Sequence, residues 1–213
     1  MQYYSMFHRC NAVKAATLLA GLTLWPALGI ADVSGQARAV QATVLGTTTA
    51  LADTGTLSGA GDAREASSLT GNIPLTGAAE VLHATTISSV DAVASEASAA
   101  NVGLSLPGIS IGAEFAMARA LAPVSGAPSG ASSIAGLTIN GSPVVVTGAP
   151  NQALNLIGAK VVINEQVPST SGMVVNALHI VITGVADVVV AGAAAGITPS
   201  TSSTLPILKL PLL

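Results

Sequence analysis

The sequence predicts an all-β protein, built as an antiparallel β-sandwich. Apolar and polar residues alternate with a period of two in several stretches, as they do along strands that bury one face. β-branched residues are frequent in these stretches and favour extended backbone. Gly, Pro, Ser and Asn separate the stretches, which is typical of sandwiches and predicts about nine to eleven strands. A β-solenoid is the alternative, although the chain has no fixed repeat period.

The first segment, residues 1–31, has the features of a signal peptide. Arg9 and Lys14 precede an apolar stretch over residues 15–28, and no acidic residue occurs before Asp32. The last residues before Asp32 are small, so cleavage is expected there. An uncleaved signal anchor is the alternative, but the apolar stretch is short for a bilayer and contains a proline.

Cleavage would change the composition of the chain. Phe115 would be the only aromatic residue left, and no cysteine would remain for a disulfide. Five basic residues against ten acidic ones give the mature chain a net charge of −5. This composition argues against nucleic acid as a partner, because nucleic-acid binding needs basic patches. We expect an extracytoplasmic protein, secreted or at the cell surface, with no transmembrane segment in the mature chain.

The mature chain is expected to begin with weakly marked strands. A strand is predicted over residues 39–47, where apolar and polar residues alternate. Residues 53–77 are predicted to be loop-rich, because Gly and Pro recur there. Residues 78–99 are predicted to form two strands joined near Ser88. One face of the first of these strands would carry Val81, His83, Thr85 and Ile87.

Residues 101–123 contain the most ambiguous element. Residues 101–107 are expected to be a connection or a short strand. Alternation over residues 109–121 favours a strand, but the run AEFAMARALA before Pro123 is also good helix-forming sequence. A Pro/Gly/Ser-rich loop is expected over residues 123–133.

The clearest strand signals lie in residues 134–182. The dipeptide Asn140-Gly141 separates apolar runs and predicts a tight hairpin, with strands over residues 136–140 and 142–147. A short strand is expected over residues 153–157. Three further strands are predicted over residues 160–167, 173–183 and 185–194. One face of the first would carry Val161, Ile163, Glu165 and Val167. One face of the second would carry Val174, Asn176, Leu178, Ile180 and Ile182.

Three runs in this region, GLTINGSPVVV, LNLIGAKVVINEQ and VVNALHIVI, resemble the domain of the bacterial choice-of-anchor P family. The most specific words are Asn164-Glu165-Gln166 and Asn176-Ala177-Leu178-His179, and the resemblance covers most of residues 32–197. It implies one exported domain, a surface or secreted location, and no known chemistry or cofactor. Residues 198–213, rich in Ser/Thr and then Leu/Pro, lack a sortase motif, which departs from the anchored members and puts anchoring in doubt.

One motif has the form of a catalytic site. Residues 108–112 match the G-x-S-x-G nucleophile elbow around Ser110, and Glu114 or Glu165 and then His179 follow in the order of a hydrolase triad. However, a proline precedes the motif and no alternating β/α pattern surrounds it. We therefore expect a chance match and no catalytic residue.

Metal and calcium sites have weak support. His83 and His179 could join Asp91, Glu165 or Asp187 as ligands, but no usual ligand spacing is present. Acidic residues near glycines could bind calcium, but the calcium-loop pattern is absent; these are Asp53, Asp62 and Asp187. We predict no metal and no cofactor.

Glu165 and Asn176 lie in otherwise apolar strands. They either line a ligand cleft or form the solvated face of a sheet. The predicted function is a secreted or cell-surface structural or interaction module without enzymatic activity and with an unknown partner. The alternatives are an extracytoplasmic serine hydrolase using Ser110, or a carbohydrate-binding module, for which Phe115 alone cannot supply an aromatic platform.

Overall fold

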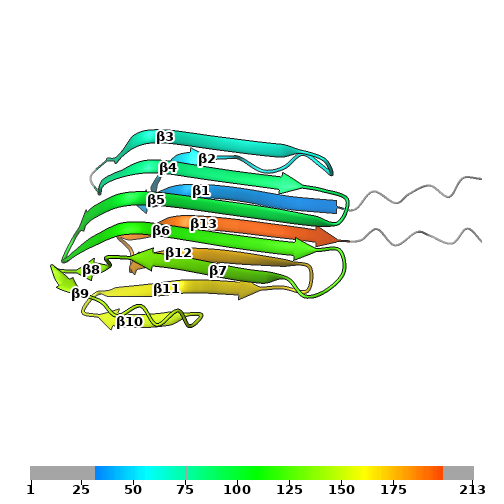
Figure 1. The fold of residues 1–213 in the computed structure, drawn as a ribbon. Helices are drawn as coiled ribbons and strands as arrows, with labels where there is room; N and C mark the ends of the chain where they lie inside the picture. The colour runs from blue at the N-terminus through cyan, green and yellow to red at the C-terminus, as the bar shows by residue number, and fades with distance from the viewer. Residues whose placement is uncertain (1–31, 75, 199–213) are drawn as a thin grey trace, which may run out of the picture.

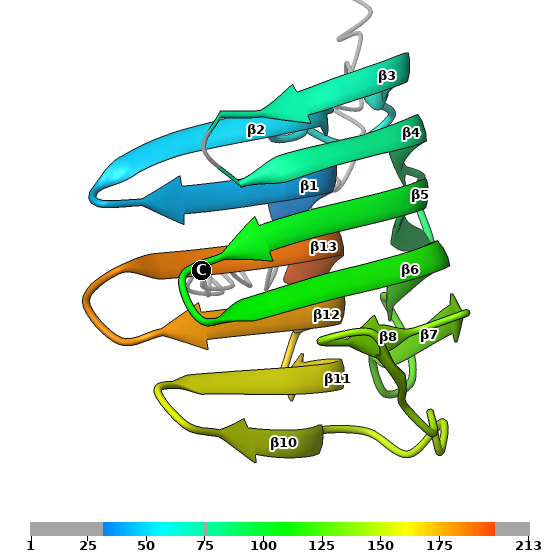
Figure 2. The same ribbon diagram turned by 90° about the vertical axis from the view of Figure 1, so that its left-hand side faces the viewer.

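The computed structural model describes residues 32–74 and 76–198, and these form thirteen β-strands in two antiparallel sheets. The two sheets stack as layers, so the predicted sandwich is confirmed (Figures 1 and 2). The strands are β1 (Asp32–Val44), β2 (Thr47–Asp53), β3 (Ala63–Ile73), β4 (Gly77–Ser88), β5 (Ala92–Leu106), β6 (Ile109–Pro123), β7 (Ser129–Ala135), β8 (Thr138–Ile139), β9 (Ser142–Pro143), β10 (Gln152–Leu156), β11 (Ala159–Pro168), β12 (Gly172–Ile182) and β13 (Ala186–Thr198). The predicted signal peptide and residues 199–213 of the predicted tail lie outside the described residues.

The first and last described strands meet at the centre of one sheet. The six-stranded sheet has the order β10-β11-β12-β13-β1-β2, and β1 pairs with β13 from Asp32 opposite Thr198 to Val44 opposite Ala186. The seven-stranded sheet has the order β3-β4-β5-β6-β8-β9, and β7 also pairs with β6. Most neighbouring strands are joined by tight hairpins, which explains the short turn-rich intervals in the sequence.

The core between the sheets is rich in alanine. Leu178, Ile180 and Ile163 are among the largest fully buried side chains, but many inward positions of β1, β5, β6 and β13 hold alanine. The Ser95 hydroxyl in β5 donates a hydrogen bond across the core to the Ala194 carbonyl oxygen in β13, at 2.6 Å. Small side chains thus let the two sheets approach closely enough for a direct hydrogen bond between them.

A line of kinks crosses the six-stranded sheet. Each of five neighbouring strands has one residue at which the alternation of inward and outward side chains shifts by one position, while the pairing register on both sides is unchanged. We call these residues the kink line: Asn164 in β11, Ala177 in β12, Ala191 in β13, Ala39 in β1 and Ala52 in β2. The pairing register between neighbouring strands is unchanged because the alternation shifts at paired positions in all five strands.

In three of the five strands the kink-line residue has a left-handed backbone conformation. Asn164, Ala191 and Ala52 have φ values of 52°, 51° and 46°, in the left-handed region. Asn tolerates this region better than most residues. In β13, Val190 and Ala191 are consecutive and both fully buried. At this kink two consecutive side chains therefore point into the core. The second of them, Ala191, is small enough to fit beside Val190.

The kink line overturns part of the predicted side-chain pattern. The sequence pattern placed Glu165 on the face of Val161 and Ile163, and Asn176 on the face of Leu178. In the structure Val161, Ile163 and Leu178 are buried, whereas Glu165 and Asn176 point outward. These two assignments were wrong because the alternation shifts at Asn164 and at the residue paired with it.

Other differences concern strand boundaries. Residues 53–77 contain β3 and are not mainly loop, and β7 begins inside the loop predicted over residues 123–133. Residues 109–121 form a strand, as predicted. The Asn140-Gly141 hairpin is confirmed, with φ values of 50° and 74°, but its second strand ends at Pro143, so residues 144–147 are not a strand.

Candidate functional site

A cluster of polar side chains lies on the outer face of the six-stranded sheet. Glu165 Oε2 accepts a hydrogen bond from Asn176 Nδ2 at 2.7 Å and lies 2.8 Å from His179 Nδ1. His179 Nε2 lies 3.2 Å from Asp187 Oδ1. Asn176 and His179 are three residues apart in β12 and face the same way because the kink line separates them. The structure therefore brings together four polar residues that the sequence analysis singled out.

This cluster does not form a metal site with His83. Glu165 and Asp187 contact opposite nitrogens of the His179 ring, so they cannot converge with that ring on one ion. His83 lies in β4 of the other sheet, with its Nδ1 3.7 Å from Glu65. Within residues 32–74 and 76–198, no three His, Cys, Asp or Glu side chains are grouped to hold a metal.

Ser110 and His179, the nucleophile and base of the hydrolase alternative, lie on opposite faces of the sandwich. Ser110 is exposed at the start of β6 in the seven-stranded sheet, and its N–H donates to Asn140 Oδ1 at 2.8 Å. His179 points outward from the other sheet, so the core lies between them. Gly108, with φ of 81°, belongs to the turn between two strands, not to a strand-to-helix turn. The G-x-S-x-G match is part of a β-hairpin.

Next to the polar cluster, a shallow trough follows β13. Its floor is made of small outward residues at every second position: Gly192, Ala194 and Gly196. Two hollows of about 230 and 310 Å³ share the residues Gln36, Val174 and Ala194 and so form one trough. We call it the β13 trough. One wall comes from Val174 and Asn176 of β12, and the other from β1, with Ser34, Gln36, Arg38 and Gln41.

The charge of Arg38 in the trough wall is balanced by Asp53. Arg38 Nε donates to Asp53 Oδ2 at 3.0 Å, and the Arg38 guanidinium also donates to the side-chain oxygen of Gln41. Burial raises the pKa of Asp53, but hydrogen bonds from the Gly55 N–H, Gln36 and Arg38 outweigh it and hold the pKa below its usual value. The Asp53 carboxylate therefore stays charged and holds the Arg38 and Gln36 side chains of the trough wall in place.

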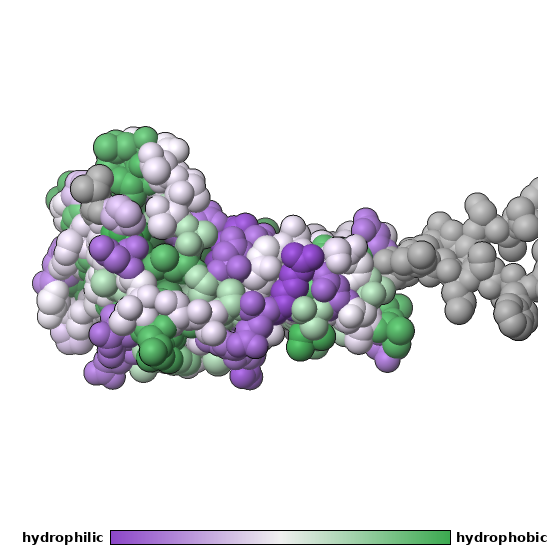
Figure 3. Space-filling view, turned by 90° about the horizontal axis from the view of Figure 1, so that it is seen from above, coloured by the Kyte–Doolittle hydropathy of each residue, from purple (hydrophilic) through white to green (hydrophobic). Residues whose placement is uncertain are grey.

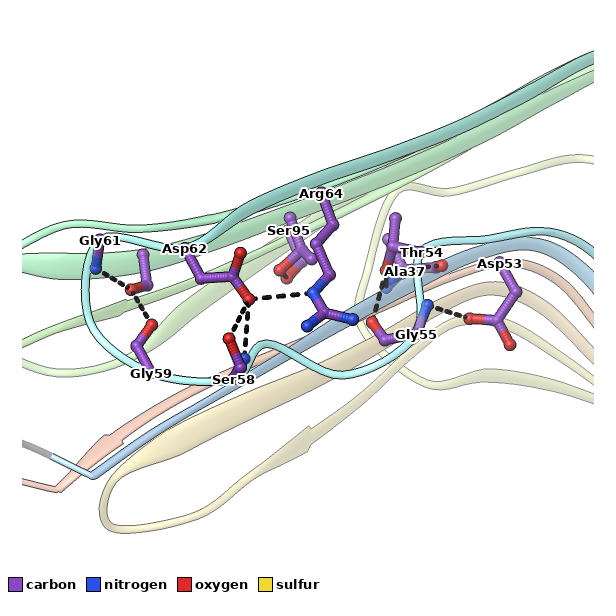
Figure 4. Close-up of polar contacts among 12 residues, drawn as sticks. Ala37, Asp53, Thr54, Gly55, Ser58, Gly59, Gly61, Asp62, Arg64 and Ser95 are labelled. Carbon is purple, nitrogen blue, oxygen red and sulfur yellow. Dashed lines mark hydrogen bonds and ion pairs between the residues drawn. The ribbon is translucent and has the colours of Figure 1, made fainter.

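The loop between β2 and β3 holds Asp62, another of the acidic residues that the sequence analysis weighed as calcium ligands and set aside. Asp62 Oδ2 accepts hydrogen bonds from the Ser58 N–H and hydroxyl, both at 2.8 Å, and from Arg64 Nε at 2.9 Å (Figure 4). Figure 3 views the molecule from the side of β2 and β3, where hydrophilic residues form a band across its middle. The Asp62 carboxylate is thus used to hold its own loop together, whereas the Asp53 carboxylate binds side chains of the trough wall.

The Asp62 contacts predict an acid-sensitive loop. The Ser58 N–H, then Arg64 and the Ser58 hydroxyl, lower the pKa of Asp62 from 3.8 to about 2. Because the folded-state pKa is the lower one, the stabilisation is complete above the unfolded pKa and is lost as the pH falls through about 2. Asp62→Asn should speed hydrogen exchange of the Ser58 amide near neutral pH, and the difference from wild type should shrink in acid.

Asp91→Asn is the matched control for this exchange measurement. Asp91 is also an exposed turn aspartate, but its carboxylate makes no hydrogen bond to the described residues. We expect this substitution to leave exchange of the Ser58 amide unchanged. Equal acid sensitivity in wild type and Asp62→Asn would show that the Asp62 carboxylate does not hold the loop.

The seven-stranded sheet carries a second, apolar hollow of about 390 Å³ on its outer face. Ile87 and Leu121 line it and are 50% and 41% exposed, which is high for large apolar side chains in a strand. The Arg119–Glu96 ion pair lies at its edge. This hollow offers apolar surface, whereas the β13 trough offers hydrogen-bonding groups.

Sequence reasoning singled out the residues of the polar cluster but did not predict that they meet, and it missed the β13 trough. The trough depends on Gly192 and on Gln36, Arg38 and Gln41, none of which was singled out. One signal was present: the five consecutive residues 192–196, GAAAG, are all small, so both faces of this strand carry only small side chains. The meaning of this run depends on polar neighbours that β1 and β12 bring from distant parts of the chain.

Comparison of the chain with protein-family models, with curated proteins and with solved structures gave no match. Among the described residues, none forms a helix of the length and apolar character needed to cross a membrane.

Proposed function

We propose that this protein is an exported interaction module, secreted or held at the cell surface, without enzymatic activity. The observation that carries the proposal is the β13 trough. It presents hydrogen-bonding groups that no other described residue uses, on the face of a paired sheet, while Ser110 and His179 lie on opposite faces. A surface of this kind suits binding better than bond cleavage, because a nucleophile needs a base within hydrogen-bond reach.

Two sequence features support the location in this proposal. Residues 1–31 have the charge and apolar pattern of a signal peptide. The runs around Asn164-Glu165-Gln166 and Asn176-Ala177-Leu178-His179 resemble the choice-of-anchor P domain, whose members are exported. That resemblance stays a prediction. Both features point to an extracytoplasmic protein, and the trough adds a reason to expect a ligand there.

Cell fractionation with mass spectrometry of the protein termini tests the location. We expect the protein outside the cytoplasm with an N-terminus near Asp32, because cleavage is predicted before that residue. A variant lacking residues 2–31 is the matched control and should stay in the cytoplasm. Full-length protein recovered from the cytoplasm with residues 1–31 intact would contradict the proposal.

Labelling with a serine-reactive phosphonate tests the absence of hydrolase activity. We expect no labelling at Ser110, because within the described residues its hydroxyl makes one hydrogen bond, to Asn140 Oδ1 at 3.5 Å, and an amide oxygen is not a base that could activate it. Labelling that disappears in Ser110→Ala would establish an activated serine and would favour the hydrolase alternative. Ser105→Ala, on the strand paired with β6, is the matched control.

A further inference from the structure

The floor of the β13 trough follows five residues of the strand, from Gly192 to Gly196. Gly192 and Gly196 are four residues apart in a strand, a distance of about 13 Å at the usual rise per residue. A Cβ atom at Gly192 would lie 3.1 Å from both Asn176 Oδ1 and Val189 Cγ1, so the absence of a side chain keeps the trough open. The two joined hollows run along this floor.

The walls offer both hydrogen-bond donors and acceptors. Asn176 uses Nδ2 to bind Glu165, and its Oδ1 accepts no hydrogen bond from the described residues. Gln36 donates through Nε2 to Asp53, and Gln41 accepts from Arg38. Within the described part of the chain, Gln36 Oε1 and Gln41 Nε2 make no protein hydrogen bond. A ligand would thus meet two free acceptors and one free amide donor.

The charge of the trough is balanced. Arg38 is the one basic residue among those that line the two hollows, and Asp53 neutralises it. A phosphate chain would find no uncompensated positive charge there, and nucleic-acid binding depends on such charge. The complementary ligand is uncharged and carries groups that both donate and accept hydrogen bonds. Hydroxyl groups have this property.

We propose that the β13 trough binds an uncharged saccharide chain. Sugar hydroxyls would pair with Asn176, Gln36 and Gln41, and the apolar faces of the rings would lie on Val174, Val189 and Ala194. The proposal rests on the proposed function and names the ligand class of the same surface. In this trough a floor of small residues between amide side chains would take the place of the aromatic platform that sugar-binding sites usually have.

A saccharide fits this surface better than an extended peptide does. Peptides that bind sheets in extended form usually add to a free strand edge, where backbone groups are unpaired. The trough lies on a sheet face, and β13 is paired on both sides, with β12 and β1. The backbone groups of the floor strand are therefore used in the sheet, and recognition falls to the side chains of the walls.

Backbone-amide NMR of the full chain, titrated with cellotetraose, chitotetraose, maltotetraose and mannotetraose at millimolar concentrations, tests the proposal. We expect at least one sugar to shift the Gly192 and Ala194 amides. Ala194→Leu should abolish this binding by filling the floor, and Asn176→Leu should weaken it about tenfold through loss of one hydrogen-bonding group. Ala94→Leu, at an outward alanine of the seven-stranded sheet, is the matched control and should bind as wild type does.

Three outcomes would overturn the saccharide proposal. These are no shift with any of the four sugars, binding that survives Ala194→Leu, and binding that is lost in Ala94→Leu. The spectrum of each variant also reports whether it is folded, so loss of binding cannot be confused with loss of structure. The location of the protein is measured separately, so an exported protein that binds none of these sugars would refute only the ligand class.

Discussion

Replacing Ala191 with valine is expected to lower the free energy of unfolding by about 2–5 kcal/mol. Ala191 is fully buried in β13 and has a φ of 51°, in the left-handed region. A β-branched residue fits that region poorly, which accounts for about 1–2 kcal/mol. The two added methyl groups must also enter a packed core beside Val190, which accounts for about 1–3 kcal/mol.

Urea unfolding of three variants separates these two causes. Ala193→Val is the matched control, because Ala193 is also buried in β13 but has no positive φ. It should show the packing cost without the backbone cost. Ala191→Gly should be close to neutral, because glycine tolerates the φ value and loses only one methyl group. Equal losses in Ala191→Val and Ala193→Val would contradict a role for the kink backbone.

Replacing Leu178 with alanine is expected to cost about 2–5 kcal/mol of unfolding free energy. Leu178 is fully buried in β12, between the kink line and Ile180. The cost should fall in the upper part of this range, because alanine neighbours such as Ala177 have no flexible side chains to fill the cavity. Thermal or urea unfolding measures the loss.

Val181→Ala is the matched control for the cavity prediction. Val181 lies in the same strand but points outward and is partly exposed. The loss of its methyl groups opens no enclosed cavity, so the cost should be well below that of Leu178→Ala. A similar cost at both positions would show that the alanine-rich core adjusts around the missing side chain.

The saccharide proposal does not depend on these stability effects. The destabilising variants Ala191→Val and Leu178→Ala change inward residues, whereas the binding variants change the outward residues Ala194 and Asn176. Inward and outward positions of one strand can therefore be tested independently. This separation is useful because the same strand, β13, supports both the core and the trough floor.

Part of the fold could be predicted from local sequence. The Asn140-Gly141 turn was recognisable because both residues tolerate positive φ. The strand over residues 109–121 was recognisable because apolar residues recur at every second position in Ile109, Ile111 and Ala113, and the structure buries all three. By contrast, β3 was missed because it lies at a sheet edge and most of its residues are exposed, so it shows no alternation.

Composition and short-range periodicity were enough to predict the fold class, several turns and the scarcity of reactive residues. The face that each polar residue occupies became clear from the pairing of the strands in the folded chain. At Asn164 the alternation shifts in neighbouring strands together, so a period of two counted along one strand assigns Glu165 and Asn176 to the wrong face. The β13 trough likewise needs residues from β1, β12 and β13, which only strand pairing brings side by side.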